Sequence, residues 1–259
     1  MKKILTTAIL CAGLVGFTAC DSFLDEDPKS SLTLDTYYKT SADIIGNVNY
    51  LYRDGAPDKM GNMTGAYRGS SLSVMNMVTG YFVNEYEGQE VDCSYARQLT
   101  RQDFTQSCCN YLTNDTWKSC YKSINVANAV IKYVDGVEMD NQAQYKAEAR
   151  FFRALNYFYL VKMFGDVPMV TEPTEDATLV EYPTRTAASE VFNTVIIPDL
   201  QFAVENLPNA TFAGNSHRVT KYAADMLLAD VYMRLGEYAN AVTPLKDVCL
   251  LYTSPSPRD

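Results

Sequence analysis

Residues 147–161 carry apolar side chains on two stripes of a helix rather than on one. One stripe consists of Ala147, Phe151, Ala154, Phe158 and Val161, and the other of Phe152, Leu155 and Tyr159. Positions three or four residues apart share a helix face, so this helix is apolar on two sides. It must be packed on both sides, which predicts an array of several helices and excludes a simple two-helix hairpin.

Other segments supply the rest of the array. We expect helices over 41–52, from Trp117 to about 136, from about 141 to Phe164, over 192–203 and over 239–248. Ser41 is a suitable N-cap. Gly165 can take the left-handed conformation that ends a helix, and Pro168 prevents the helix from resuming. Pro198 should kink the helix that contains it, and residues 59–105 have the composition of loops and short helices.

The segment from Leu227 to Leu245 matches the tetratricopeptide pattern. The matching positions are Ala229, Tyr232, Gly236, Tyr238 and Ala241. Small residues let paired helices approach each other, and the Gly-x-Tyr turn joins them. The dipeptides at 164–165 and 235–236 are about 70 residues apart, about twice the 34-residue period. We therefore expect an all-α fold, a tetratricopeptide-like helical-repeat solenoid with irregular Gly/Tyr-rich loops.

The N-terminus has the layout of an export signal. Lys2 and Lys3 precede an apolar run that is too short to span a bilayer. The sequence Phe17-Thr18-Ala19-Cys20 resembles the lipobox of bacterial lipoproteins, which predicts cleavage before Cys20 and acylation of its thiol and amine. In the alternative interpretation, Cys20 is a free cysteine within a discarded signal.

These features suggest four segments. Residues 1–19 are the signal, and residues 20–31 form an acidic tether that resembles the surface-export signal of Bacteroidetes lipoproteins. Residues 32–248 form the helical domain. Residues 249–259 have neither cap nor apolar rhythm and look like a translated sequencing adapter, so we expect a non-native tail on a shortened gene.

Charge excludes one class of partner. The formal net charge is −9, and removing signal and tail makes it more negative, because Lys2, Lys3 and Arg258 leave with only one acid, Asp259. Nucleic-acid binding depends on neutralising phosphates with Lys and Arg, so we expect no nucleic-acid partner.

The cysteines and the histidine favour no reaction. Four cysteines remain in the helical domain, and they allow one or two disulfides or, equally, unpaired thiols; they are Cys93, Cys108, Cys109 and Cys120. None has C-x-x-C metal spacing. His217 is the single histidine and lies in a loop-like stretch, so the usual triads and His-based metal sites have no partner. We expect no catalytic residue, metal or cofactor.

Four segments, in order, resemble the SusD/RagB family. They are WKSCYKSINVANAVI (117–131), AEARFFRALNYFYLVKMFGDVPMV (147–170), IPDLQFAVENLP (197–208) and RVTKYAADMLLADVYMRLGEYANAV (218–242). CDSFLDEDP, from Cys20, resembles the family's lipidated start. Family members are considerably longer, and this chain corresponds to their N-terminal half.

The resemblance implies a lipid-anchored, cell-surface protein of the outer membrane. It would bind nutrient oligosaccharides or peptides and deliver them to a TonB-dependent, SusC-type transporter. Sugar binding uses aromatic faces and polar side chains, so we expect ligand contacts at Tyr81, Tyr86, Tyr95 and Arg97, in an exposed polar stretch. Trp117, in an apolar stripe, is expected in the core, and further contacts belong to sequence that this chain lacks.

A second function remains open. Helix pairs of the tetratricopeptide type form protein-binding grooves, so the alternative is a surface scaffold for protein–protein interaction with no small ligand.

Overall fold

The structure, a computed structural model, describes residues 33–53, 79, 81, 101–102, 107–174, 183–211 and 213–251. The chain divides into two compact units, 1–37 and 38–259. Only the short helix α2 (Leu34–Tyr37) is described in the first unit, and Thr33 and Thr36 hydrogen-bond to each other at its start.

The second unit is helical. Its longer helices are α3 (Ser41–Arg53), α6 (Ser107–Tyr133), α7 (Gln142–Phe164), α9 (Ile197–Asn206), α10 (Lys221–Arg234) and α11 (Tyr238–Leu251). Its short elements are η3 (Val134–Gly136), α8 (Ala188–Val191), η4 (Phe192–Ile196) and η5 (Ala213–Asn215). Beyond these helices, the described residues contain one isolated β-bridge, between Val167 and Thr186.

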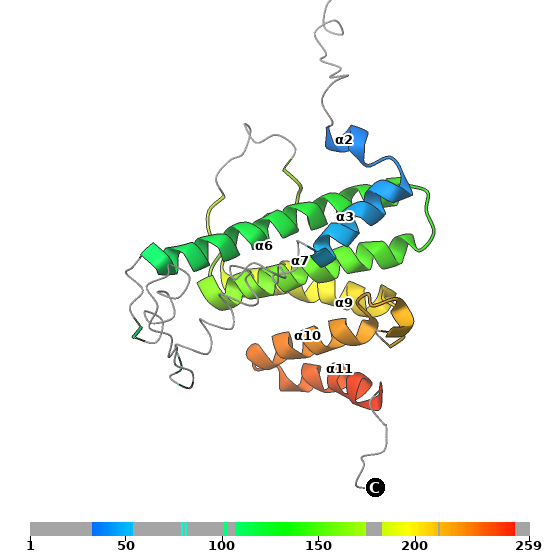
Figure 1. Cartoon of the computed structure of the whole chain (residues 1–259). Helices are drawn as coiled ribbons and strands as arrows, with labels where there is room; N and C mark the ends of the chain where they lie inside the picture. Colours follow the sequence, from blue (N-terminus) through cyan, green and yellow to red (C-terminus); the bar gives the residue numbers. More distant parts are fainter. Residues whose placement is uncertain are drawn as a thin grey trace, which may run out of the picture. The chain divides into compact units, whose positions relative to one another are not determined.

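Successive helices pack on one another. In Figure 1, α6 and α7 run antiparallel, and α9, α10 and α11 follow in order. The contacts agree, because α7 packs on α6 and α9, α9 on α10, and α10 on α11, while α3 lies on α6 and α7. The expected all-α helical-repeat fold is confirmed.

Helix α7 is buried on both sides, as its two apolar stripes predict. It contacts α6, α3 and α9. Tyr157 and Leu160 have no exposed surface, and Phe151 and Phe152 are buried in the same helix. This helix is therefore the centre of the described core.

Several helix boundaries differ from the predictions; the helix expected over 192–203, for example, runs from Ala188 to Asn206 as α8, η4 and α9. Thr40, not Ser41, caps α3: its hydroxyl accepts from the N–H of Asp43, whose carboxylate accepts from the N–H of Thr40 at 2.8 Å. Helix α6 begins ten residues before Trp117. Helix α11 continues to Leu251, since cysteine and leucine can extend a helix without apolar rhythm.

Two glycines end helices with positive φ. Gly165 after α7 has φ 69° and ψ −123°, and Gly236 after α10 has φ 76°. The expected positive φ at Gly165 is confirmed, but its ψ lies outside the left-handed helical region. That combination is the mirror image of extended backbone, which glycine alone adopts easily.

The structure has a π-helical turn next to Pro198, where a kink was expected. The residues before it, Phe192–Ile196, form a π-helical turn, and Pro198 lies in the first turn of α9. Proline has no N–H, and its ring clashes with the carbonyl four residues earlier, at Thr194. A wider π turn relieves that clash.

The chain after α7 is fastened to α6 and α7 by polar side chains. The hydroxyl of Tyr157 donates to the carbonyl of Val170 at 2.8 Å and accepts from the N–H of Val170 at 2.7 Å. The hydroxyl of Tyr121 donates to the carbonyl of Pro168, and Asn125 accepts from the N–H of Thr174. Burial raises the pKa of the Tyr157 hydroxyl to about 12, so it stays a donor at neutral pH. We call residues 167–174 the strap.

A buried ion pair connects the strap to α9. Arg153 donates to both carboxylate oxygens of Asp199, at 2.6 and 2.8 Å, and to Asn128 Oδ1 at 2.9 Å. Asn128 in turn donates to the carbonyls of Val170 and Glu172. Burial raises the pKa of Asp199, which is 2% exposed, and the Arg153 guanidinium counteracts part of that change. These residues thus join α6, α7, α9 and the strap.

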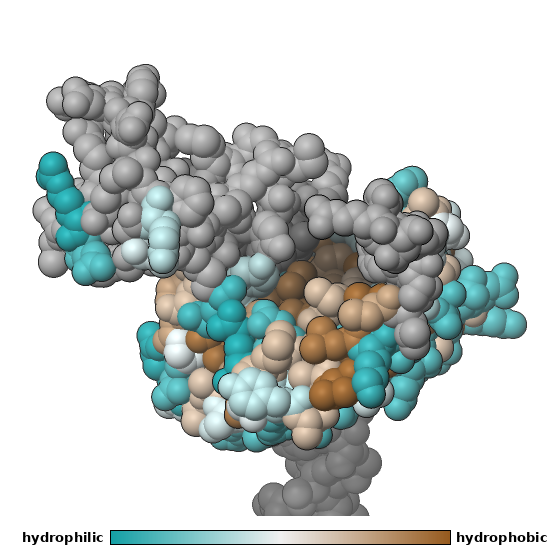
Figure 2. Space-filling view, turned by 90° about the horizontal axis from the view of Figure 1, so that it is seen from below, coloured by the Kyte–Doolittle hydropathy of each residue, from teal (hydrophilic) through white to brown (hydrophobic). Residues whose placement is uncertain are grey.

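Helices α10 and α11 expose large apolar side chains. Met226 and Met233 share a face of α10, while Tyr238, 69% exposed, and Val242 share a face of α11. Figure 2, seen from below, shows hydrophobic residues lying between hydrophilic ones on this side of the second unit. We call these four residues the α10–α11 apolar surface.

Candidate functional site

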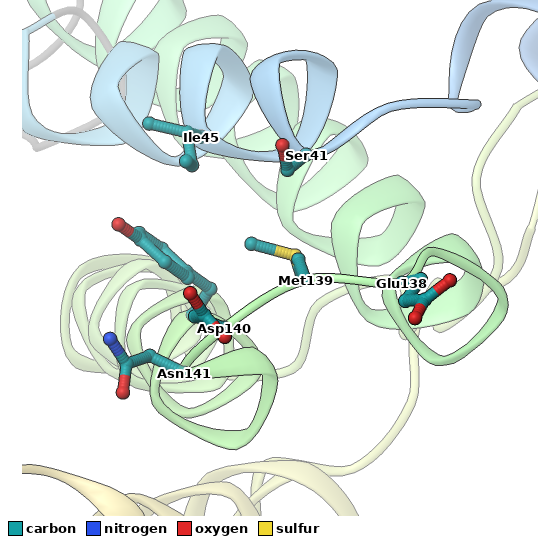
Figure 3. A pocket seen from close by; sticks show the side chains of 7 residues that line it. Ser41, Ile45, Glu138, Met139, Asp140 and Asn141 are labelled. Carbon is teal, nitrogen blue, oxygen red and sulfur yellow. The ribbon is translucent and has the colours of Figure 1, made fainter.

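A pocket of about 650 Å³ opens where the N-terminal ends of α3 and α7 meet. It is lined by Ser41, Ile45, Glu138, Met139, Asp140, Asn141 and Tyr145, and we call it the α3–α7 pocket. Figure 3 shows Ser41 and Ile45 of α3 on one side and the loop residues Met139 and Asp140 on the other. Its volume falls within the range of about 300–1,000 Å³ that is usual for small-molecule sites.

The loop that forms one wall is hydrogen-bonded by a side chain at the start of α7. Gln142 Nε2 donates to the carbonyls of Val134 and Val137, at 2.7 and 3.0 Å. Asn141 has φ 57°, which asparagine tolerates better than most residues, and its side chain makes no capping hydrogen bond. The amide of Asn141 is exposed beside the pocket. The wall is therefore built before any ligand arrives, which lowers the entropic cost of binding.

The aromatic wall, Tyr145, is contacted by an arginine that is not itself part of the pocket lining. The Arg218 guanidinium lies 5.3 Å from the centre of the Tyr145 ring and 4.8 Å from the centre of the Tyr52 ring. A cation over an aromatic face is attracted by the ring quadrupole. Arg218 therefore couples Tyr145 of α7 to Tyr52 of α3.

Glu148 fixes that arginine. Its side chain has no exposed surface, and Arg218 Nε and Nη2 donate to its carboxylate at 3.0 and 2.5 Å. Tyr52 and Gln144 also donate to it. Burial disfavours the charged guanidinium, but hydrogen bonds and charge from Glu148 outweigh burial and raise the pKa of Arg218. Burial, followed by the Glu148 charge, raises the pKa of Tyr52.

A turn with two positive-φ residues aims Arg218 at Glu148. Ser216 and His217 have φ of 52° and 61°, and the N–H of Arg218 donates to the carbonyl of Asn215. Positive φ at both central positions is the pattern of a type I′ turn. The Asn215 side chain donates to the carbonyl of Val219 at 2.9 Å. The Asn215 side chain therefore stabilises the strained backbone of the turn that carries Arg218.

The pocket offers oxygen acceptors and apolar surface without a basic residue in its lining. Glu138 and Asp140 supply two carboxylates, and Tyr145, Met139 and Ile45 supply apolar area. Such a lining favours ligands that carry hydroxyl donors and disfavours anions. Across the described residues, no group of three or more His, Cys, Asp or Glu side chains is arranged to hold a metal ion.

Of the residues predicted to contact ligand, one is described. Tyr81 is 88% exposed, which agrees with an accessible aromatic side chain, and no described contact brings it to the α3–α7 pocket. Tyr86, Tyr95, Arg97 and the lipid-attachment residue Cys20 lie outside the described residues. Their roles stay predictions.

Two other sequence expectations concern Trp117 and His217. Trp117 packs against Tyr121 and Phe164, with ring centres 5.0 and 5.1 Å apart, and is half-buried. It packs in an aromatic cluster but is not among the buried core residues, so the prediction holds only in part. His217 is exposed and lies in the turn before α10.

Cys120 carries a free, buried thiol, so for this residue the unpaired alternative holds. Burial raises the pKa of that thiol to about 12. The side chains of Cys93, Cys108 and Cys109 lie outside the described part of the chain. No helix among the described residues is long and apolar enough to cross a membrane.

The sequence reasoning missed the residues of the α3–α7 pocket. Ser41 and Asn141 are a hundred positions apart, and no periodicity connects them. The available signal was local: Glu138, Asp140 and Asn141 cluster between two helical patterns, next to the first tyrosine of the following helix. Loops that carry polar residues on a rigid scaffold are frequent binding sites.

Comparison with known proteins identifies the family. Residues 22–233 match the sequence profile of SusD-like proteins, described as starch-binding and associating with the outer membrane. The chain belongs to the SusD-like family. This confirms the resemblance seen in the four ordered segments.

Individual SusD-like relatives agree over most of this chain. It is 29% identical over 244 residues to SusD-like protein P2 of Formosa agariphila, covering 93% of this chain and 45% of that protein. It is 29% identical over 248 residues to a SusD-like protein of Bacteroides ovatus, covering 93% of this chain and 40% of that one. The chain thus spans less than half the length of these curated relatives.

A solved SusD-like structure supports the same fold. A laminarin-binding SusD-like protein superimposes with a TM-score of 0.66 and 25% sequence identity, covering 82% of this chain and 44% of that one.

Proposed function

We propose that this SusD-like chain belongs to a glycan-capture protein of the bacterial cell surface that binds oligosaccharides without altering them. The profile match over residues 22–233 carries the proposal, since that family is described as starch-binding and outer-membrane-associated. The laminarin-binding relative supports a polysaccharide fragment as the ligand. The rigid α3–α7 pocket, with aromatic and carboxylate walls, is a feature that such a ligand can use.

The protein is proposed to reach the membrane through lipid rather than through a spanning helix. Acyl chains on Cys20 would hold it at the outer membrane, facing outward, because two or more chains make a stable anchor. Its partner would be a TonB-dependent, SusC-type transporter that receives the captured glycan. Catalysis, cofactors and nucleic acid have no part in this proposal.

Calorimetry with the full chain tests glycan capture. The panel comprises laminarihexaose, xyloglucan heptasaccharide, maltohexaose and a mixture of oligopeptides. Saturable heat with at least one glycan, and no shortening of that glycan on prolonged incubation, is the expected result. Binding of peptides alone would contradict glycan capture, and hydrolysis of the glycan would contradict a passive role.

Cell fractionation tests the anchor. Labelling with a palmitate analogue should place lipid on the wild-type protein and none on Cys20→Ala, with the variant released from the outer-membrane fraction. Equal labelling of both proteins would contradict anchoring through Cys20.

A further inference from the structure

We propose that the α3–α7 pocket binds a neutral saccharide, with Tyr145 as the stacking platform and the Glu138 and Asp140 carboxylates as acceptors for sugar hydroxyls. The inference rests on the proposed glycan-capture function and adds to it a location, a set of contacts and a charge preference. All seven lining residues belong to described parts of the second unit.

The first argument is the aromatic wall. Sugar rings present patches of C–H groups, which pack well on the electron-rich face of an aromatic side chain. Tyr145 is held on one side by Arg218, which is itself bonded to Glu148 and, at 2.8 Å, to Asn49. A platform that is already fixed loses little freedom when a ligand stacks on it, so its contact is retained as affinity.

The second argument is the set of polar groups around that platform. Carboxylates accept hydrogen bonds only, and a sugar presents several hydroxyl donors. Glu138, Asp140 and the exposed amide of Asn141 lie on one loop, which Gln142 pins to the backbone. The Ser41 hydroxyl, at the start of α3, adds a group that both donates and accepts.

The third argument is charge. Two carboxylates line the pocket and no lysine or arginine does. A uronic-acid or sulfated saccharide would bring like charge against them, and like charges repel. The geometry therefore favours neutral sugars over acidic ones.

Binding of laminarihexaose, xyloglucan heptasaccharide and maltohexaose to the full chain and its variants tests the location. A detergent without a sugar headgroup keeps the lipid anchor soluble and leaves the pocket free. We expect Tyr145→Ala to weaken binding of the best panel ligand at least about tenfold, and Tyr145→Phe, which keeps the ring, to stay within about twofold of wild type.

A second variant tests the pocket independently, in case Tyr145→Ala fails to fold. Ser41 is exposed, so Ser41→Trp should leave the core intact while its indole fills the pocket and weakens binding by about tenfold or more. Glu205→Trp adds the same side chain at an exposed position of α9 and should bind as wild type does. Thermal unfolding of each variant checks that the fold is retained.

Charge preference is tested with the best panel ligand and its C6-oxidised derivative, which carries uronic acids. Wild type should bind the oxidised form at least about tenfold more weakly, and Glu138→Gln with Asp140→Asn should reduce that difference to about threefold or less. Equal binding of both forms by wild type would overturn the preference for neutral sugars.

The outcomes separate the two proposals. If wild type binds a glycan and neither Tyr145→Ala nor Ser41→Trp weakens it, the ligand sits elsewhere, which overturns this inference and leaves glycan capture standing. If wild type binds no glycan of the panel, glycan capture itself is contradicted, and this inference falls with it.

Discussion

Glu148 is the residue that depends most on its neighbours. It has no exposed surface, and its carboxylate is surrounded by donors from α3, α7 and the turn before α10. A buried charge is tolerated only when it is paired and hydrogen-bonded. Arg218 provides the pairing charge. The contact between Arg218 and Glu148 therefore joins α3, α7 and the turn before α10, and it also positions Tyr145, the aromatic wall of the pocket.

Removing Arg218 should therefore be costly. We expect Arg218→Met to lower the free energy of unfolding by about 2–3 kcal/mol, because an uncompensated carboxylate stays buried. Urea denaturation measures the loss. The double variant Arg218→Met with Glu148→Gln should recover part of it, since the remaining side chain is neutral. A loss below about 0.5 kcal/mol for the single variant would contradict the importance of this pair.

Asp43 makes the start of α3 sensitive to acid. Hydrogen bonds from the side chain and then the backbone of Thr40 hold the pKa of Asp43 below its ordinary value. A carboxyl whose pKa is lowered by folding adds stability above its unfolded pKa, and this stability is lost as pH falls through the folded value. We expect Asp43→Asn to lower the melting temperature at about pH 6 and to match wild type once the pH falls below the folded pKa of Asp43. An equal difference at both pH values would rule out this titration.

At the scale of elements, the helix ends and the strap determine where the described chain changes direction between helices. Gly165 ends α7 and leads into the strap, where buried tyrosine and asparagine side chains bond to the backbone. The segment 147–170, which marks the family at the level of sequence, is therefore a structural unit. Its Arg153, Tyr157 and Gly165 hold the strap and α9 in place.

Two glycines give opposite expectations for the same substitution. A Cβ on Gly165 or on Gly46 would meet no atom within 4 Å, so backbone conformation alone decides the effect. Gly165→Ala should lower the free energy of unfolding by about 1–3 kcal/mol because of its positive φ. Gly46→Ala, inside α3, should raise it by about 0.5–1 kcal/mol. Thermal unfolding of both variants is the measurement, and a stabilising Gly165→Ala would contradict the argument.

Tyr157→Phe tests the strap. It removes one hydroxyl that both donates to and accepts from Val170, so unfolding should become easier by about 1–3 kcal/mol. The amide of Val170 should also exchange its hydrogen faster. Tyr222→Phe is the control, because that hydroxyl bonds to exposed Asn209, and its effect should stay below about 0.5 kcal/mol. Equal effects of both substitutions would contradict a special role for Tyr157.

For the whole molecule, sequence patterns predict the architecture better than the pocket. The two stripes of 147–161 require neighbours on both sides, and Gly165 and Pro198 mark where helices end or bend, all from local rules. The pocket depends on contacts that no local rule contains. Arg218 and Glu148 are 70 residues apart in sequence, and only the packed helices bring them together.

The α10–α11 apolar surface belongs to this scale too. We expect residues 38–251, produced alone, to self-associate, because exposed large apolar side chains promote contact between molecules. Tyr238→Lys with Val242→Lys should shift sedimentation toward the monomer. Ala239→Lys with Thr243→Lys adds the same charge at exposed neighbouring positions and should shift it less. A monomeric parent fragment would contradict the expectation.

The span of the Arg218 contacts affects the order in which the chain can fold. Arg218 bonds to Asn49 across 169 positions, and the N–H of Val219 donates to Tyr52 across 167. Synthesis makes α3 well before these partners, whereas α6 and α7 are neighbours along the chain. Closing so long a loop makes such contacts slow to form. During synthesis, α3 is therefore made early and docks onto its partners late. Until then, other contacts must cover its apolar face.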